Sequence, residues 1–220
     1  MANGYYPPGY FTFHAEGAST DPATNSLHFP KGKSGVTIGP GYDLKTRTKE
    51  DVYRDMIAIG VSKEDANIIK EGVGKMHEEA KRFVDDNKNK IKKLTKAQKI
   101  MLFKIIWNST YYSGAKSVYK TKVPKKIFEK DIEVLNKKDS TLSWDKTNWD
   151  DLNNKILDIV IDLHYQGALA KNSSVQYAIS KNDPLYLADC IGKFPKLVSY
   201  DRNRKRIPYL RGTFSGPSNF

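Results

Sequence analysis

The sequence has a single cysteine, no long hydrophobic run and no recognisable export signal at its start. Cys190 alone cannot form an internal disulfide or a cysteine-based zinc site, which is typical of synthesis in a reducing compartment. No apolar stretch approaches the roughly 18 residues that a membrane span needs, so we expect no membrane span. The first eight residues lack the basic patch and apolar stretch of a secretory signal, so we expect synthesis in the cytoplasm without a signal peptide.

Positive charge is what the sequence has in excess. The 220 residues include 37 Lys and Arg against 25 Asp and Glu, which gives a formal net charge of +12. A field of that size attracts polyanions such as nucleic acid, acidic phospholipid or an anionic bacterial cell wall. The same charge also fits a lysine-rich, solvated surface with no particular partner. Hydrophobic residues make up 39% of the chain, which is enough for a packed core.

The composition changes near residue 47. Residues 1–47 are rich in Gly, Pro, Ser, Thr and Tyr, and residues 36–38, closed by Gly39-Pro40-Gly41, predict one arm of a small sheet. Residues 12–16 are expected to form a strand end or a short helical turn. From Thr48 onward the signals are helical. We therefore expect an α+β fold that is mainly α, with a small β-containing lobe (1–47) and a helical lobe (48–220) in a single domain (1–220).

Several local patterns predict individual helices. Hydroxyl residues that begin capping boxes or close variants mark helix starts at Thr48, Ser62 and Thr95. Residues 96–108 predict a largely buried helix, and apolar residues at helical spacing from Trp149 to Leu163 predict an amphipathic one. Shorter helices are expected over residues 124–136, 173–181, 184–191 and 200–211, the last of them interrupted by Pro208.

Side chains suited to catalysis gather in the first 43 residues. In one extended strand Thr37 and Asp43 would lie about 20 Å apart, at ~3.3 Å per residue. A turn at Gly39-Pro40-Gly41 would bring Asp43 toward Thr37, because glycine permits positive φ and proline fixes its own φ. Glu16 precedes a glycine at the end of the preceding element, where a side chain can point into a cleft.

Two carboxyl groups and a hydroxyl are what the cleavage of a glycosidic bond requires. One carboxyl donates a proton to the leaving oxygen, and the second group positions water or stabilises the oxocarbenium-like transition state. The acid must stay protonated near neutral pH, and Phe11 and Phe13 are candidate apolar neighbours. These residue types are common, so an ordinary structural interpretation has Glu16 exposed, Thr37 in a strand and Asp43 capping a helix.

Two motifs in this region resemble the pesticin-like muramidase domains of the phage-type lysozyme superfamily. They are Phe-His-Ala-Glu-Gly at residues 13–17 and Ser-Gly-Val-Thr-Ile-Gly-Pro-Gly-Tyr-Asp-Leu at residues 34–44. The resemblance is close over residues 11–45 and looser beyond. Residues 162–168 resemble the aromatic-Gln segment that lines the cleft of these enzymes, and residues 201–210 resemble their Arg-rich C-terminal helix.

The resemblance implies a lysozyme-like fold with a cleft between an N-terminal lobe and a helical lobe. It implies Glu16 as the general acid, Asp43 as the second carboxylate and Thr37 beside the catalytic water. Asp21, a turn residue before Pro22, is an alternative second carboxylate. The residues expected to contact or surround the glycan are His14, Tyr42, Tyr165, Gln166 and Gly167.

The function implied is a peptidoglycan hydrolase, an N-acetylmuramidase that cuts the β-1,4 bond between N-acetylmuramic acid and N-acetylglucosamine. We expect an antibacterial toxin or a phage lysis domain that acts in the periplasm or cell wall after export or release. The chemistry needs no metal or organic cofactor, and His14, Glu16 and His28 lack the spacing of a zinc site.

The expected partner is the glycan strand of peptidoglycan, with an immunity protein as a further candidate and no nucleic acid. We expect a monomer. Two alternatives stay open from the residues alone. One is a lytic transglycosylase, which uses a lone glutamate, and the other is a non-enzymatic basic module that binds cell wall or nucleic acid.

Overall fold

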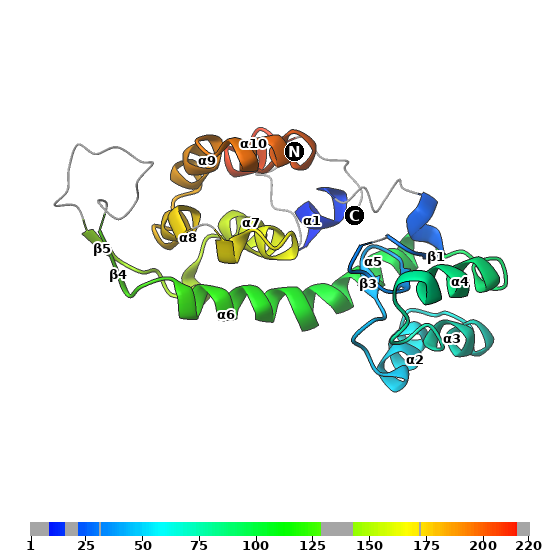
Figure 1. Ribbon diagram of the computed structural model, residues 1–220. Coiled ribbons are helices and arrows are strands. Elements are labelled where there is room, and N and C mark those ends of the chain that lie inside the picture. The colour runs from blue at the N-terminus through cyan, green and yellow to red at the C-terminus, as the bar shows by residue number, and fades with distance from the viewer. Residues whose placement is uncertain (1–8, 16–21, 31, 129–142, 172, 215–220) are drawn as a thin grey trace. The chain divides into compact units, whose positions relative to one another are not determined.

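The computed structural model describes residues 9–15, 22–30, 32–128, 143–171 and 173–214, which form helices and two small antiparallel sheets (Figure 1). This confirms the expectation of an α+β chain that is mainly α. The chain divides into two compact units, which we call the sheet unit (Glu16–Trp107) and the terminal unit (Met1–Ala15 with Asn108–Phe220). None of the helices in the described ranges is both long and apolar enough to cross a bilayer.

The sheet unit combines a three-stranded sheet with helices. The antiparallel strand order is β1 (Leu27–His28), β2 (Thr37–Ile38) and β3 (Tyr42–Asp43), and the turn η1 (Pro22–Asn25) precedes β1. The helices are α2 (Lys49–Ala58), α3 (Lys63–Lys70), α4 (His77–Asn87) and α5 (Lys96–Ile106). Because β1 contacts α4 and β3 contacts α5, the sheet packs with the helices up to Trp107, whereas the sequence suggested a boundary at residue 47.

Three helices of this unit begin where the capping residues predicted. The side chains of Thr48, Ser62 and Thr95 each accept a hydrogen bond from the backbone N–H three residues later, at 3.0, 3.1 and 3.2 Å. At Thr95 the capping box is complete, because the Gln98 side chain accepts the backbone N–H of Thr95 at 2.9 Å. Each such cap stabilises its helix by about 1 kcal/mol, which fixes where α2, α3 and α5 start.

The helix expected over residues 96–108 continues farther than the pattern suggested. The helix α5 passes into a π-helical turn, η2 (Trp107–Tyr111), and then into α6 (Tyr112–Lys122) (Figure 1). Leu102 and Phe103 are fully buried, but Met101 is 45% exposed. The helix is therefore buried along one side, as its 3.6-residue period requires, rather than around most of its circumference.

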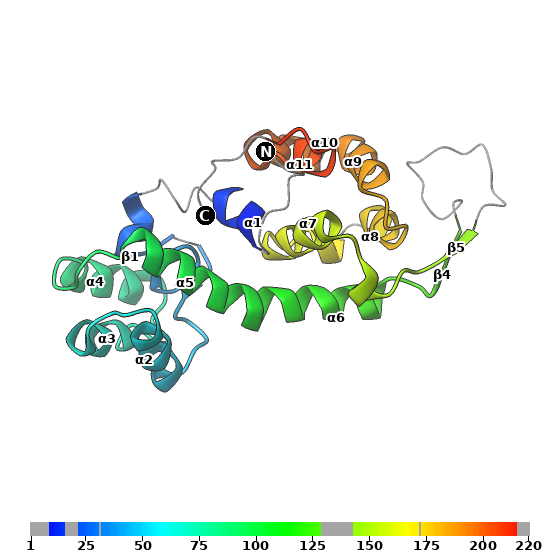
Figure 2. The ribbon, with the colours of Figure 1, turned by 180° about the vertical axis from the view of Figure 1, so that it is seen from behind.

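The helix α7 (Asn154–Tyr165) is the centre of the terminal unit. It contacts α1 (Tyr10–Ala15), α6, α9 (Pro184–Gly192) and α11 (Arg206–Leu210), and Figures 1 and 2 show it between α6 and the group α9–α11. The predicted apolar stripe, Trp149, Leu152, Ile156, Ile159, Val160 and Leu163, is buried throughout. Its first residue lies in η4 (Trp149–Asp151). The turn η5 (Leu169–Lys171), α8 (Ser173–Ser180) and α10 (Pro195–Arg204) complete the unit, and α8 and α9 confirm two of the expected short helices.

The helix expected over residues 124–136 is wrong in its described part. Lys126–Phe128 forms β4, which pairs antiparallel with β5 (Ser143–Asp145) and sets Ile127 opposite Trp144. Ile127 is buried in this arrangement. The strand depends on a partner that is distant in sequence, so a local pattern of helix formers could not predict it. The remainder of the expected helix lies outside the described residues.

The last expected helix, over residues 200–211, is two helices that separate at Lys205 and not at Pro208. Lys205 has a left-handed conformation with φ of 64°, between α10 and α11. Pro208 is the third residue of α11, where its missing N–H would have no partner within the helix, so it is tolerated. Asp201 supports the new start by accepting the backbone N–H groups of Arg206 and Ile207 at 2.6 and 3.3 Å.

Cys190 is a buried residue of α9. It is fully buried, and its Sγ lies 3.7 Å from the carbonyl oxygen of Ser174. Burial raises the pKa of the thiol to about 12, so the group is protonated at neutral pH and is a poor nucleophile.

Candidate functional site

The hairpin of β2 and β3 brings Thr37 and Asp43 together. The two residues are direct cross-strand partners, so the fold-back expected at Gly39-Pro40-Gly41 is confirmed. Gly39 and Gly41 have φ values of 62° and 86°, a region in which a residue with a Cβ is strained. The N–H of Gly41 donates to the carbonyl of Gly39 at 2.9 Å, which closes a tight turn around Pro40.

The Asp43 carboxylate is held by backbone N–H groups. Its Oδ1 accepts from Lys45 at 2.8 Å, and the N–H of Gly35 lies 3.3 Å from Oδ1 and 3.2 Å from Oδ2. A Cβ at Gly35 would lie 2.7 Å from the Cβ of Lys45 and 2.8 Å from the carbonyl oxygen of Lys75, so only glycine fits there. Thr37 is almost fully buried, and its hydroxyl donates to the carbonyl of Gly35 at 3.3 Å. Gly35 therefore links both predicted site residues.

Tyr42 lies in the core of the sheet unit. It is fully buried, its hydroxyl donates to Asp55 Oδ2 at 2.7 Å, and the Arg47 guanidinium lies 3.8 Å from its ring centroid. Burial, together with the hydrogen bond to Asp55, raises the pKa of the phenol well above its ordinary value. The Tyr42 ring could stack on a sugar only by leaving this core, so its observed role is packing.

Glu16 and its alternative partner Asp21 lie outside the described residues. His14 is described, in the last turn of α1, and is half-buried. Its ring lies 4.2 Å from the Tyr10 ring and 5.5 Å from the Phe13 ring, between centroids. His28 lies elsewhere, in β1, with its Nδ1 3.1 Å from the Ser26 carbonyl. Among the described residues, no three His, Cys, Asp or Glu side chains are grouped as a metal site would require.

The other predicted glycan contacts lie at the C-terminal end of α7. Tyr165 packs on Tyr111 with ring centroids 4.6 Å apart. Gln166 is exposed at the end of the helix, and its Oε1 accepts a hydrogen bond from Arg206 Nη2. Gly167 has φ of 66° and ends the helix in the left-handed conformation. Gln166 and Gly167 are thus solvent-exposed, but the contact of these residues with a glycan stays a prediction.

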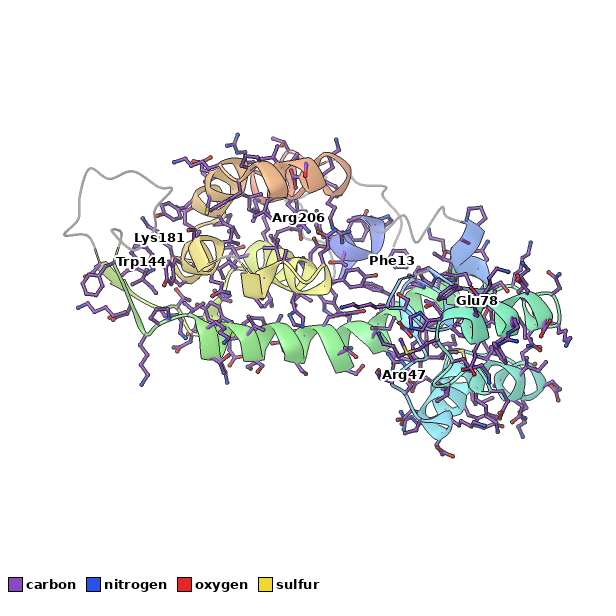
Figure 3. The ribbon with its side chains drawn as sticks, viewed as in Figure 1. Phe13, Arg47, Glu78, Trp144, Lys181 and Arg206 are labelled. Atoms are coloured by element: carbon purple, nitrogen blue, oxygen red, sulfur yellow. The ribbon has the colours of Figure 1, made fainter. Side chains whose placement is uncertain are left out.

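A buried arginine–aspartate cluster lies directly behind Gln166, and sequence reasoning missed it. Asp162 is fully buried and binds two arginines, of which Arg206 is labelled in Figure 3. Arg204 reaches it through Nε at 3.0 Å and Nη2 at 2.5 Å, and Arg206 through Nε at 2.8 Å and Nη2 at 2.7 Å. Burial lowers the pKa of the Arg206 guanidinium, and its Nη1 has no hydrogen-bond partner within the described structure.

Arg204 and Arg206, from the segment that resembles an Arg-rich C-terminal helix, thus have Asp162 as their carboxylate partner. Arg211 instead pairs with Asp189 at 2.6 Å. The signal that could have found the cluster is Asp162 itself, an acidic residue inside the apolar stripe of α7.

A second buried acid, Asp158, lies one turn earlier on α7. Its Oδ2 accepts the Tyr209 hydroxyl at 2.6 Å, and its Oδ1 accepts the backbone N–H of Gly9 at 3.3 Å. Burial raises the pKa of this carboxyl to about 7, and the charge of Asp162 acts in the same direction. Asp158 thereby ties the start of α1 and the helix α11 to the central helix.

Comparison with known proteins gives one relationship. No curated protein matches this chain. A family model, described as a domain of unknown function (DUF8812), matches residues 9–129 and 114–207. These matches cover most of the 220 residues, including the hairpin of Thr37 and Asp43 and the buried cluster around Asp162. The chain therefore belongs to the family described as domain of unknown function DUF8812.

Proposed function

We propose that this protein is a peptidoglycan hydrolase, an N-acetylmuramidase with a lysozyme-like fold that acts on the bacterial cell wall. Glu16 protonates the glycosidic oxygen as the bond breaks. Asp43 stabilises the developing positive charge or accepts a proton from the attacking water, and Thr37 positions that water. All three residues belong to the sheet unit, which runs from Glu16 to Trp107.

The observation that carries this proposal is the cross-strand pair of Thr37 and Asp43. They lie six positions apart in sequence, and the glycine-proline turn makes them neighbours. Glycines with positive φ at two positions of one short hairpin are a demanding arrangement. The glycine-proline turn predicted this fold-back from the sequence, and the resemblance to muramidases implies a role in catalysis for the same two residues.

The contacts of Asp43 also favour one assignment of the two carboxyl roles. Its oxygens accept N–H groups from Gly35 and Lys45, so they serve as hydrogen-bond acceptors. Acceptor oxygens oriented in this way suit the stabilisation of positive charge. The motif gives the donation of the proton to Glu16.

The first test is the clearing of purified peptidoglycan by wild-type protein and by Glu16→Gln. Removal of the general acid should lower the rate by roughly 10²- to 10⁴-fold, while circular dichroism shows an unchanged fold. Glu50→Gln is the matched control, because Glu50 is an exposed glutamate of α2 in the same unit. Wild-type clearing at the level of a heat-killed sample, or equal rates for Glu16→Gln and Glu50→Gln, would end the proposal.

The second carboxylate is identified by comparing Asp43→Asn with Asp21→Asn. We expect Asp43→Asn to lose activity and Asp21→Asn to keep it. Mass spectrometry of the released fragments then separates hydrolysis, which adds water, from the transglycosylase reaction, which leaves an anhydro sugar. Anhydro products together with an active Asp43→Asn would assign the chain to the transglycosylases instead.

A further inference from the structure

The connection between α4 and α5 concentrates positive charge on a short segment of the sheet unit. Residues 88–96, which we call the lysine loop, contain five lysines in nine positions and no acidic or aromatic residue. The five lysines are Lys88, Lys90, Lys92, Lys93 and Lys96. The sequence alone is equally consistent with a solvated helix entry, so the structure around the loop decides what it can do.

The backbone of the lysine loop is anchored along its length. Ile91 and Leu94 are only 6% exposed, so they fix the loop to the core of the unit. The N–H of Lys92 donates to Asp65 Oδ2 at 3.1 Å, and the N–H of Leu94 donates to the carbonyl of Asn25 at 2.7 Å. A loop held by both apolar side chains and backbone hydrogen bonds loses little further conformational freedom when it binds a partner.

The inward anchors direct the intervening lysines toward solvent. Lys90, Lys92 and Lys93 are exposed, and none of them has a carboxylate within 4.0 Å in the described parts of the chain. Lys90 approaches only the neutral Asn87 Oδ1, at 3.4 Å. The three positions lie within about 10 Å of one another, because a chain extends by at most ~3.3–3.6 Å per residue. They present closely spaced cations that no carboxylate of the described residues neutralises.

The neighbouring lysines show that this arrangement is not general in the unit. Lys88 pairs with Asp85 at 3.1 Å, and Lys49 pairs with Glu71 at 2.5 Å. Lys99, just beyond the loop, is buried and donates to the Thr24 hydroxyl at 3.2 Å. Lys90, Lys92 and Lys93 thus form a group of exposed cations within four consecutive positions of an anchored backbone.

We propose that the lysine loop is a docking surface for the carboxylates of peptidoglycan. This inference rests on the proposed function, because the polymer that the site would cut carries carboxylates on its peptide stems. Ammonium groups bind carboxylates as point charges and need no bidentate geometry. The absence of any aromatic residue in the loop argues against single-stranded nucleic acid, since bases would find no ring on which to stack.

The test measures the binding of intact protein to sedimented peptidoglycan sacculi from which phosphate polymers have been removed. The loop variant is Lys90→Gln/Lys92→Gln/Lys93→Gln. The matched control is Lys120→Gln/Lys122→Gln/Lys125→Gln, which removes three exposed lysines of the terminal unit that have no ion pair with any described residue. All proteins carry Glu16→Gln so that the wall is not degraded during the measurement.

We expect the loop variant to lose roughly a hundredfold in affinity at low salt, at about fivefold per lysine, as lysines near an anionic surface do. The control should change less than threefold. Amidation of the sacculus carboxylates with carbodiimide and methylamine should lower the affinity of the parent protein for sacculi to that of the loop variant. Added salt should lower the affinity of the parent protein steeply and that of the loop variant only slightly, because salt screens the attraction between exposed charges.

Equal losses in the two triple variants, or unchanged binding to amidated sacculi, would overturn the inference. Loop-dependent binding to duplex DNA that exceeds binding to sacculi would overturn it as well. The clearing assay keeps the two proposals apart. If the protein binds sacculi through the loop but never cuts them, the proposed muramidase activity is refuted and the docking surface is retained. If it cuts sacculi without needing the loop for binding, only the docking surface is refuted.

Discussion

Asp158 should make the terminal unit less stable as the pH rises from about 4 to about 7. The carboxyl is buried, and burial raises its pKa to about 7 in the folded protein. In the unfolded chain it returns to about 3.9. Between these two pKa values the folded state holds a proton that the unfolded state has released. Each unit of increase in pH therefore lowers the free energy of unfolding.

The magnitude follows from the two pKa values. A difference of about 3 units, at 1.36 kcal/mol per unit, gives a loss of about 4 kcal/mol. The loss begins near the pKa of the unfolded chain and is complete slightly above pH 7. His164 acts in the opposite direction, because burial lowers its pKa and the stability that it contributes rises with pH. A variant that changes only Asp158 separates the two effects.

Asp158→Asn is that variant, since an amide copies the protonated acid and can still accept one hydrogen bond. Urea unfolding at several pH values gives the free energy of unfolding of the variant minus that of the parent. This difference should increase by about 4 kcal/mol from pH 4 to pH 8. A Trp107→Phe background confines the fluorescence to Trp144 and Trp149, which both lie in the terminal unit. Asp189→Asn, at an exposed aspartate, should leave the pH profile unchanged. A difference between Asp158→Asn and parent that is constant over this range would refute the reasoning.

Two further substitutions test packing around the buried cluster and the hairpin. Arg206→Met leaves the buried Asp162 with one cation and should lower the free energy of unfolding by about 3–5 kcal/mol in urea titrations. Arg211→Met, at a half-exposed ion pair, should change the free energy of unfolding by less than about 1 kcal/mol. Gly35→Ala forces a Cβ to within 2.7 Å of the Cβ of Lys45 and should cost about 1–3 kcal/mol in the same assay. Gly192→Ala, where the added carbon meets only Ile207 at 3.8 Å, should be neutral or slightly stabilising; equal losses at both glycines would contradict the steric argument.

Features that depend on neighbouring residues were predictable from the sequence. The hydroxyls of Thr48, Ser62 and Thr95 cap the helices that follow them, because a cap needs only the next three residues. The approach of Asp43 to Thr37 was predictable for a similar reason, since the turn between them is made of two glycines and a proline. The apolar stripe of α7 was evident from its spacing.

Features that depend on distant partners were not predictable. Nothing near Lys126 in the sequence shows that Ser143–Asp145 will pair with it to form a strand. Arg206 is separated from Asp162 by 44 positions, so its pairing could not be chosen over the other nearby acids. Tyr42 looked suited to stack on a sugar until Asp55 and Arg47 proved to enclose it. In each case a tertiary contact determines the structure or the role of the residue, and the local sequence pattern does not contain that contact.

The burial of Cys190 makes this chain convenient for site-specific chemistry. The sequence contains no other thiol, and this one is shielded from solvent inside α9 and keeps its proton at neutral pH. Maleimides and spin labels react with exposed thiolates. A cysteine introduced at any solvent-exposed position, such as Lys93, would therefore take up a probe selectively while the native protein serves as its own unlabelled reference.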